Sequence, residues 1–187
     1  MTSETLVQPA DDLREVLADE AAFRRWYDRM IPSVYSYVAS RCLGDEDLAQ
    51  ELTQQTFIAA IHGRARFDGR SEPVTWLCGI ARHKLADHFR RLEREEARTL
   101  RASVHALAQE GPDEAARWRG VDDRIVIADT LRRLPAAQRA VLTFVALDDL
   151  PVAEAARLLG KSFGATQSLL ARARESFRQA YPRGVEP

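Results

Sequence analysis

Residues 150–178 combine polar and basic side chains with the apolar spacing of two short helices. Apolar residues recur at intervals of three and four from Val152 to Leu159, which predicts one apolar helix face. Gly160 can take the left-handed conformation that ends a helix, and Ser162 can cap the next helix by accepting a backbone N–H. This pattern is typical of a helix-turn-helix, whose second helix can lie in the major groove of DNA.

The two predicted helices have recognisable faces. Pro151 is expected in the first turn of the first helix, where its missing N–H has no consequence. On the second helix we expect an apolar stripe of Thr166, Leu170, Ala173 and Phe177, and outward or flanking residues Gln167, Ser168, Ala171, Arg172 and Arg178. Such polar groups can reach bases or phosphates, but a solvated helical hairpin at the end of a soluble bundle looks similar.

A second basic helix is predicted after a loop at residues 67–73, which holds Phe67, Asp68, Gly69 and Arg70. Its apolar stripe runs from Trp76 to Phe89. The positive charges beside this stripe are Arg82, Lys84, Arg90, Arg91 and Arg94. Arginine and lysine neutralise phosphates, and a rigid aromatic ring can occupy the place of an unstacked base. Burial of Trp76 in an ordinary core is the alternative.

An acidic and polar strip is expected on the helix that precedes this loop. It consists of Asp47, Gln50, Glu51, Gln54 and Gln55. Spacing alone favours a solvated surface, and the functional alternative is a docking face for a basic partner helix.

Composition indicates a folded protein of the cytoplasm. The 187 residues are 45% apolar and 29% charged, and a net charge of −1 conceals an acidic start and a basic C-terminal part. Two cysteines, Cys42 and Cys78, are too few for a disulfide framework. We see neither a signal peptide nor a run near the roughly 18 apolar residues that a membrane helix needs.

The sequence offers no catalytic constellation. Cys78, His83 and His88 are five residues apart on a predicted helix, which turns successive side chains by about 140° and keeps them from converging on a metal. A Gly-rich phosphate loop, a nucleophile elbow and an HExxH motif are missing from the sequence. We therefore expect no enzyme, no cofactor and no metal.

Helical periodicity and sparse breakers predict an all-α chain of two small helical domains. We expect an acidic N-terminal lead at residues 1–20, a helical domain at 21–94, a linker at 95–120 and the helix-turn-helix domain at 121–181. Within the first domain, Pro32 is expected to bend or interrupt its helix. The expected buried stripe of that helix is Phe23, Tyr27, Ile31, Val34, Tyr35 and Val38.

Four segments in order resemble the extracytoplasmic-function group of the sigma-70 family. They are FRRWYDRMIPSVYSYV, DEDLAQELTQQTFIAAI, RFDGRSEPVTWLCGIARHKLADHFRR and LRRLPAAQRAVLTFV, the last leading into the helix-turn-helix. The resemblance spans about Phe23 to Phe177. It implies regions 2 and 4 without the domain between them, and a factor that directs bacterial RNA polymerase to specific promoters and helps to open the −10 element.

The resemblance also implies roles for particular residues. Asp47, Glu51, Gln54 and Gln55 would face core RNA polymerase. The −10 element would be contacted by Phe67, Trp76, Arg82, His83, Lys84 and Arg90. The −35 element would be contacted by Lys161, Ser162, Gln167, Ser168 and Arg172. Promoter DNA and polymerase are thus the implied partners, and an anti-sigma factor is a further one.

Several positions depart from the pattern of the family. Gln55 stands where Glu is common, His83 where Asn is usual, and Val74 where Arg is frequent. In GATQSLLARAR, Gln167 and Leu169 replace Lys and Arg, which removes two cations from the helix expected to approach DNA. We therefore expect weaker docking and weaker or unusual −35 binding.

Two other functions agree with parts of the sequence. A stand-alone helix-turn-helix regulator would use only the C-terminal domain. A helical adaptor that binds only proteins would agree with the reduced number of basic residues on the second helix of the helix-turn-helix. A separate hypothesis is that the six acids of residues 1–20 screen the basic DNA surfaces before polymerase binds.

Overall fold

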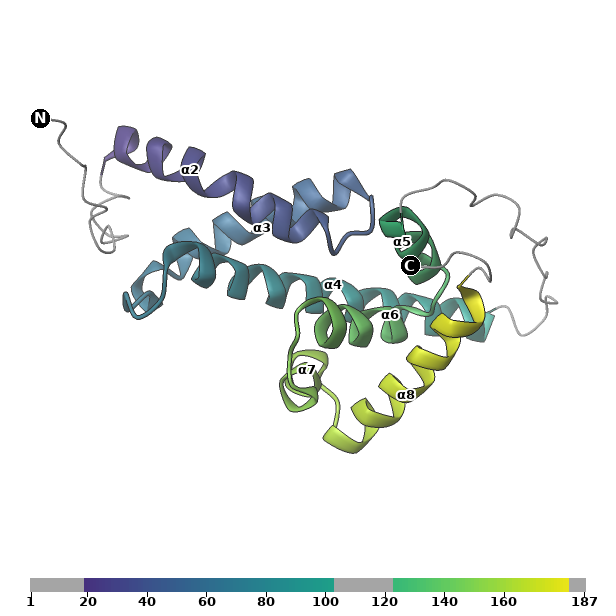
Figure 1. Ribbon diagram of the computed structural model, residues 1–187. Helices are drawn as coiled ribbons and strands as arrows, with labels where there is room; N and C mark the ends of the chain where they lie inside the picture. Colours follow the sequence, from purple (N-terminus) through teal and green to yellow (C-terminus); the bar gives the residue numbers. More distant parts are fainter. Residues whose placement is uncertain (1–18, 103–122, 182–187) are drawn as a thin grey trace, which may run out of the picture. The chain divides into compact units, whose positions relative to one another are not determined.

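The computed structural model describes residues 19–102 and 123–181, which form helices and turns with no strand among them (Figure 1). In chain order the elements are α2 Glu20–Ala39, α3 Glu46–His62, the 3-10 turn η1 Arg64–Arg66, α4 Pro73–Ala102, α5 Asp123–Arg132, α6 Ala136–Leu142, the π-helical turn η3 Thr143–Leu147, α7 Val152–Leu159 and α8 Phe163–Ala180. The expected all-α class is confirmed for these residues. None of the described helices is long and apolar enough to span a bilayer.

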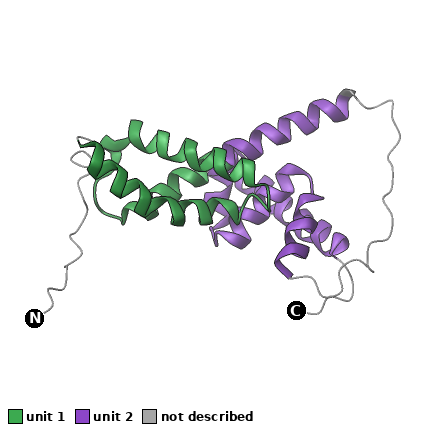
Figure 2. Cartoon of the chain, turned by 90° about the horizontal axis from the view of Figure 1, so that it is seen from above, with its two compact units in different colours: residues 1–85 green, residues 86–187 purple. Residues whose placement is uncertain are grey.

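The chain divides into two compact units, residues 1–85 and 86–187 (Figure 2). The division falls within α4, which continues to Ala102 and therefore includes the start of the segment expected to be a linker. Most of the acidic N-terminal lead and the linker residues 103–120 lie outside the described residues. The hypothesis that the lead screens DNA surfaces concerns those residues and stays a hypothesis. The predicted domain limits stay predictions.

In unit 1, aspartates begin the first two helices. Asp19 accepts a hydrogen bond from the backbone N–H of Ala22 at 2.8 Å, and Asp45 accepts one from Leu48 at 2.9 Å. Each carboxylate satisfies a backbone donor that the first helical turn leaves without an intrahelical partner. The turn before α3 uses the positive φ of Gly44, 87°, which glycine adopts without steric penalty.

Pro32 was expected to bend or interrupt its helix, and the expectation of an interruption is wrong, because α2 runs through Pro32 as one helix. Proline removes one backbone donor, but α2 packs on α3 through buried residues on both sides of it, Trp26 before and Val34 and Val38 after. This packing outweighs the lost hydrogen bond. Trp26, only 2% exposed and outside the expected stripe, meets the ring of Phe57 edge-on at 5.8 Å.

In unit 2, α6 and α7 both pack against α8, and this arrangement builds the helix-turn-helix. The buried apolar side chains here include Val126, Leu131, Leu134, Val141, Phe144, Leu159, Leu170 and Ala173. Phe89, on the part of α4 that belongs to this unit, meets Phe144 edge-on at a centroid distance of 6.1 Å. Aromatic pairs in this geometry are favourable beyond the area that they bury.

The start of α6 depends on a residue forty positions earlier. Its N-cap, Pro135, has no side-chain hydrogen bond to offer. The carboxylate of Glu96 accepts from the backbone N–H of Ala136 instead, at 2.9 and 3.1 Å, and lies 3.9 Å from the guanidinium of Arg139. Burial lowers the pKa of Arg139, and the negative charge of Glu96 acts in the opposite direction.

Five buried threonines satisfy their hydroxyl groups locally. Each donates to the carbonyl oxygen of the residue four positions earlier in the chain. The acceptor residues are Ala49 for Thr53, Leu52 for Thr56, Val126 for Thr130, Arg139 for Thr143 and Ser162 for Thr166. These hydroxyls therefore need no partner on a neighbouring helix.

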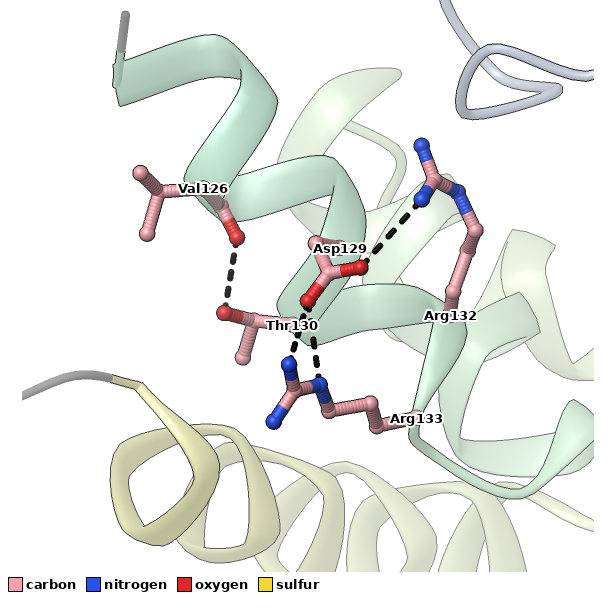
Figure 3. A network of polar contacts seen from close by, with 5 residues as sticks. All are labelled: Val126, Asp129, Thr130, Arg132 and Arg133. Carbon is pink, nitrogen blue, oxygen red and sulfur yellow. Dashed lines mark hydrogen bonds and ion pairs between the residues drawn. The ribbon is translucent and has the colours of Figure 1, made fainter. Parts of the chain in front are cut away.

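The end of α5 is held by a small ionic network (Figure 3). Asp129 accepts from Arg133 at 2.7 Å and from Arg132 at 3.3 Å, while Thr130 donates to the carbonyl of Val126 at 2.8 Å. The two arginines also lie at the C-terminal end of the helix, where its dipole favours positive charge.

We expect Glu96→Ala to lower the free energy of unfolding by about 1 kcal/mol, since it removes the only carboxylate at the start of α6 among the described contacts. Urea unfolding followed by circular dichroism measures this change. The control is Glu95→Ala, an exposed neighbour on the same helix. Equal stability of the two variants would show that the contact does not stabilise the unit.

Candidate functional site

The outer surface of α3 carries the acidic and polar strip. Asp47, Glu51 and Gln54 are exposed and Gln55 is half-buried, on one side of the helix. The side-chain amide of Gln55 donates a hydrogen bond to the carboxylate of Glu51 at 2.8 Å, so part of the hydrogen-bonding capacity of both groups is already used within the helix. The strip therefore presents fewer unsatisfied acceptors than its composition suggests.

An apolar side chain that the sequence analysis missed extends this strip. Ile58 is 47% exposed and follows Gln54 by one helical turn. It borders an open hollow of about 390 Å³, which Gln55, His62 and Lys84 also line. Its spacing of four residues from Gln54 and three from Gln55 could have predicted from the sequence that Ile58 lies on the same helix face. The strip thus combines hydrogen-bonding groups with one exposed hydrophobic residue, as protein-binding surfaces commonly do.

The loop before α4 is ordered by its own polar groups. Asp68 accepts from the backbone N–H of Arg70 at 3.1 Å and pairs with its guanidinium at 2.5 Å. The backbone hydrogen bond is the main cause that lowers the pKa of Asp68, and the side-chain bond adds to it. Gly69 supplies the positive φ, 72°, that this turn requires. The loop is one residue shorter than expected, because Pro73, predicted to belong to it, is the first residue of α4.

This loop holds Phe67 against Trp76. Their ring centroids are 5.2 Å apart with planes inclined at 51°, and both residues are half-buried. Trp76 is thus neither enclosed in the core nor fully solvated. A half-buried aromatic pair can offer a stacking surface to an unpaired base while remaining fixed in position.

The basic residues of α4 differ in their surroundings. His83 is exposed, Lys84 is half-buried, and Arg82 donates to the hydroxyl of Tyr37 at 3.3 Å. Arg90 is exposed and paired with Asp87, on the part of α4 assigned to unit 2. Trp76, His83 and Arg90 recur every seven residues, so they share one face of the helix.

The turn between α7 and α8 has the predicted local chemistry. Gly160 is left-handed, with φ 65°, and Ser162 accepts from the backbone N–H of Ala165 at 3.2 Å. Pro151 is the N-cap of α7 rather than a residue of its first turn, one position earlier than expected. The extended ψ of Pro151, 141°, keeps it outside the helix.

The residues expected to contact duplex DNA mostly lie on the open side of α8. Ser162, Gln167, Ser168 and Arg172 are exposed, while Lys161 is half-buried and donates to Glu93 at 2.8 Å. Leu169, where the resembling family often has Arg, is only 7% exposed and belongs to the core.

The sequence analysis also missed Phe163. This first residue of α8 is 52% exposed, and it lies one helical turn before Gln167. Extending the helical register back to the capping serine would have identified it as outward-facing.

The thiol of Cys42 is unsuited to metal binding or nucleophilic chemistry. Burial, and secondarily the charge of Asp45, raises its pKa to about 12. The thiolate is the reactive and ligating form, and at neutral pH it is scarce here. Among the described residues, no three His, Cys, Asp or Glu side chains converge in a metal-binding group.

Comparison with known proteins identifies both parts of the chain. Residues 26–95 match the family model for sigma-70 region 2, and residues 124–177 match that for sigma-70 region 4. The ECF RNA polymerase sigma factor SigC of Mycobacterium tuberculosis is 37% identical over 143 residues, which are 76% of this chain and 74% of that protein. The ECF sigma factor SigF of Caulobacter vibrioides is 30% identical, over 86% of each chain.

A solved structure has a similar fold. The sigma factor RpoE of Bartonella quintana, crystallised in complex with the anti-sigma factor NepR, superposes with a TM-score of 0.52 at 22% identity. The match covers 87% of this chain and 98% of that one.

We expect Glu93→Gln to increase the salt dependence of binding to duplex DNA. Lys161 would lose its carboxylate partner and become available to a phosphate, so the slope of log K against log salt should steepen by about 0.9. Fluorescence anisotropy with a random-sequence duplex measures this slope, because phosphate contacts do not depend on sequence. Glu95→Gln is the matched control, and equal slopes for both variants would rule out a phosphate contact by Lys161.

Proposed function

Since the chain belongs to the extracytoplasmic-function (ECF) group of the sigma-70 family, we propose residue-level roles for its two units. The chain is a sigma factor, the subunit that directs bacterial RNA polymerase to specific promoters and helps to initiate transcription. The observation that carries this conclusion is the presence of sigma-70 regions 2 and 4, in that order, in one chain. Polymerase supplies the chemistry of RNA synthesis.

The strip on α3 is proposed as the surface that docks on core polymerase. Asp47, Glu51 and Gln54 offer exposed acceptors, and Ile58 offers an apolar contact. The hydrogen bond that Gln55 donates to Glu51 must rearrange or remain in place when polymerase binds, and Glu51 keeps its negative charge in both cases. The neutral side chain of Gln55 supports docking that depends less on charge than in relatives with Glu at this position.

Recognition and opening of the −10 element are proposed for the loop and basic face around α4. Phe67 and Trp76 form the stacking surface, and Arg82, His83, Lys84 and Arg90 supply hydrogen bonds and positive charge. Unstacking a base costs a few kcal/mol, which stacking on an aromatic side chain can offset in part. The exposure of His83 on the Trp76 face supports a direct contact with the strand.

The −35 element is proposed to bind α8 and the turn before it. Four of the proposed contact residues are exposed, namely Ser162, Gln167, Ser168 and Arg172. Lys161 becomes available to DNA when its hydrogen bond to Glu93 breaks. Few cations remain on this surface, so the affinity of the free protein for duplex DNA should be low. Polymerase compensates by holding both regions on one promoter.

Regulation by an anti-sigma factor is a further proposal. The solved chain of similar fold is bound to such an inhibitor. A cytoplasmic location follows from the proposed partners, since polymerase and promoter DNA are found there. A stand-alone regulator would leave region 2 without a role, and an adaptor would leave both DNA-facing surfaces without one.

Initiation from a promoter library tests the proposed function. We expect transcripts that begin at defined positions only when this protein and bacterial core polymerase are both present, and aligned start sites that share −10 and −35 elements. Failure to bind core polymerase at low salt, or an absence of core-dependent transcripts, would overturn it.

We expect Trp76→Ala to reduce open-complex formation about tenfold, because one stacking surface for an extruded base is lost. Permanganate reactivity of unpaired thymines in the promoter measures opening. Trp76→Phe should retain most of the activity. A template already mismatched across the −10 element should restore the alanine variant, whereas a purely structural defect would persist on that template.

A further inference from the structure

Phe163 is one of the large apolar side chains that the described structure leaves exposed. It is the first residue of α8 and 52% exposed, directly after the capping Ser162. Single hydrophobic residues on a surface are common and by themselves mean little. The position of Phe163 on the second helix of a helix-turn-helix makes it informative, because the N-terminal residues of that helix contact base edges.

Phe163 lies in the row of side chains that α8 turns away from the core. Residues 163 and 167 share one exposed row, and residues 164, 168 and 172 form the next. The opposite side of the helix is buried through Thr166, Leu169, Leu170 and Ala173. At Gly164 a Cβ would have no heavy atom within 4 Å, so the backbone beside Phe163 is open to close approach.

Charge on α8 favours nucleic acid as the occupant of this surface. Its exposed charged side chains are Arg172, Arg174 and Arg178 against the single acid Glu175. This positive charge, on the second half of α8, complements phosphates, although Arg178 is paired with Glu175. Phe163 itself can neither pair with a phosphate nor form a hydrogen bond to a base.

An apolar ring has one specific target in the major groove. The methyl group that base pairs display there is the C5-methyl of thymine, and phenylalanine is suited to contact it. Gln167, one turn away in the same row, can form two hydrogen bonds to adenine. With Gln in place of a cation at 167, this row is better matched to A·T pairs than to guanine.

We propose that Phe163 is a specificity-determining residue of this sigma factor, which packs against the methyl group of a thymine in the −35 element. This inference rests on the proposed function, in which α8 binds the −35 duplex. It assigns part of the promoter preference to an apolar contact in a recognition helix that has few cations.

Methyl deletion in the DNA tests this contact directly. A holoenzyme of core polymerase and the full chain first selects its promoter from a library randomised across both elements. Each thymine of the enriched −35 element is then replaced by deoxyuridine, which removes only the methyl group. Competition binding compares these duplexes with the wild-type holoenzyme and with Phe163→Ala, Phe163→Leu and Leu100→Ala, the last altering an apolar residue that is 71% exposed on α4.

One thymine should respond through Phe163. Its replacement by deoxyuridine should weaken wild-type binding about threefold to fivefold, the effect expected for one buried methyl group. Phe163→Ala should bind the thymine duplex correspondingly more weakly and be insensitive to deoxyuridine. Phe163→Leu should keep part of the sensitivity, and Leu100→Ala should keep all of it.

Other results would overturn the inference. An enriched −35 element without thymine, or equal sensitivity of the wild type and Phe163→Ala to every methyl deletion, excludes the contact. Weaker binding of Phe163→Ala to core polymerase itself would assign the ring to a protein contact instead. If the holoenzyme enriches no shared element, the proposed function itself fails. If it enriches shared elements but Phe163 does not affect sensitivity to methyl deletion, only this inference fails.

Discussion

The hydrogen bonds from Ala136 to Glu96 are the constraint on which the C-terminal unit depends. Helix α6 begins after a proline that has no side chain able to cap it, and it has only seven residues, Ala136–Leu142. A helix this short is unstable in isolation, so its first turn needs external support. Glu96 supplies that support from α4, and α6 then packs against α8. The orientation of α8, the helix proposed to bind DNA, is therefore linked through α6 to the carboxylate of Glu96 on α4.

Local chemistry explains why the turn and the helical faces could be predicted. Gly160 and Ser162 act on neighbouring backbone groups, and the stripes of α3 and α4 follow from helical periodicity. Sequence spacing could not reveal contacts between distant residues. The pairing of Lys161 with Glu93, the burial of Leu169 and the enclosure of Trp26 all depend on which helices meet. The continuity of α2 through Pro32 has the same origin, because packing outweighs the local preference of proline.

Positive charge in the proposed DNA-binding surfaces is largely engaged within the protein. Lys161 pairs with Glu93, Arg90 with Asp87, and Arg82 donates to Tyr37. In the proposed DNA complex each of these groups would exchange a protein partner for a phosphate or base, which would reduce the net gain from the DNA contact. Such a sigma factor is suited to bind promoters only as part of a larger complex. The weak intrinsic attraction to DNA that we propose would also limit its retention at unrelated sites.

The local hydrogen bonds of the buried threonines have a mechanical consequence. Because each hydroxyl is satisfied by a carbonyl four residues earlier in the chain, these threonines impose no polar register between packed helices. Neighbouring helices can slide by small amounts without leaving a buried hydroxyl unpaired. At these sites the relative position of neighbouring helices is therefore set by the packing of apolar side chains and not by the geometry of a hydrogen bond.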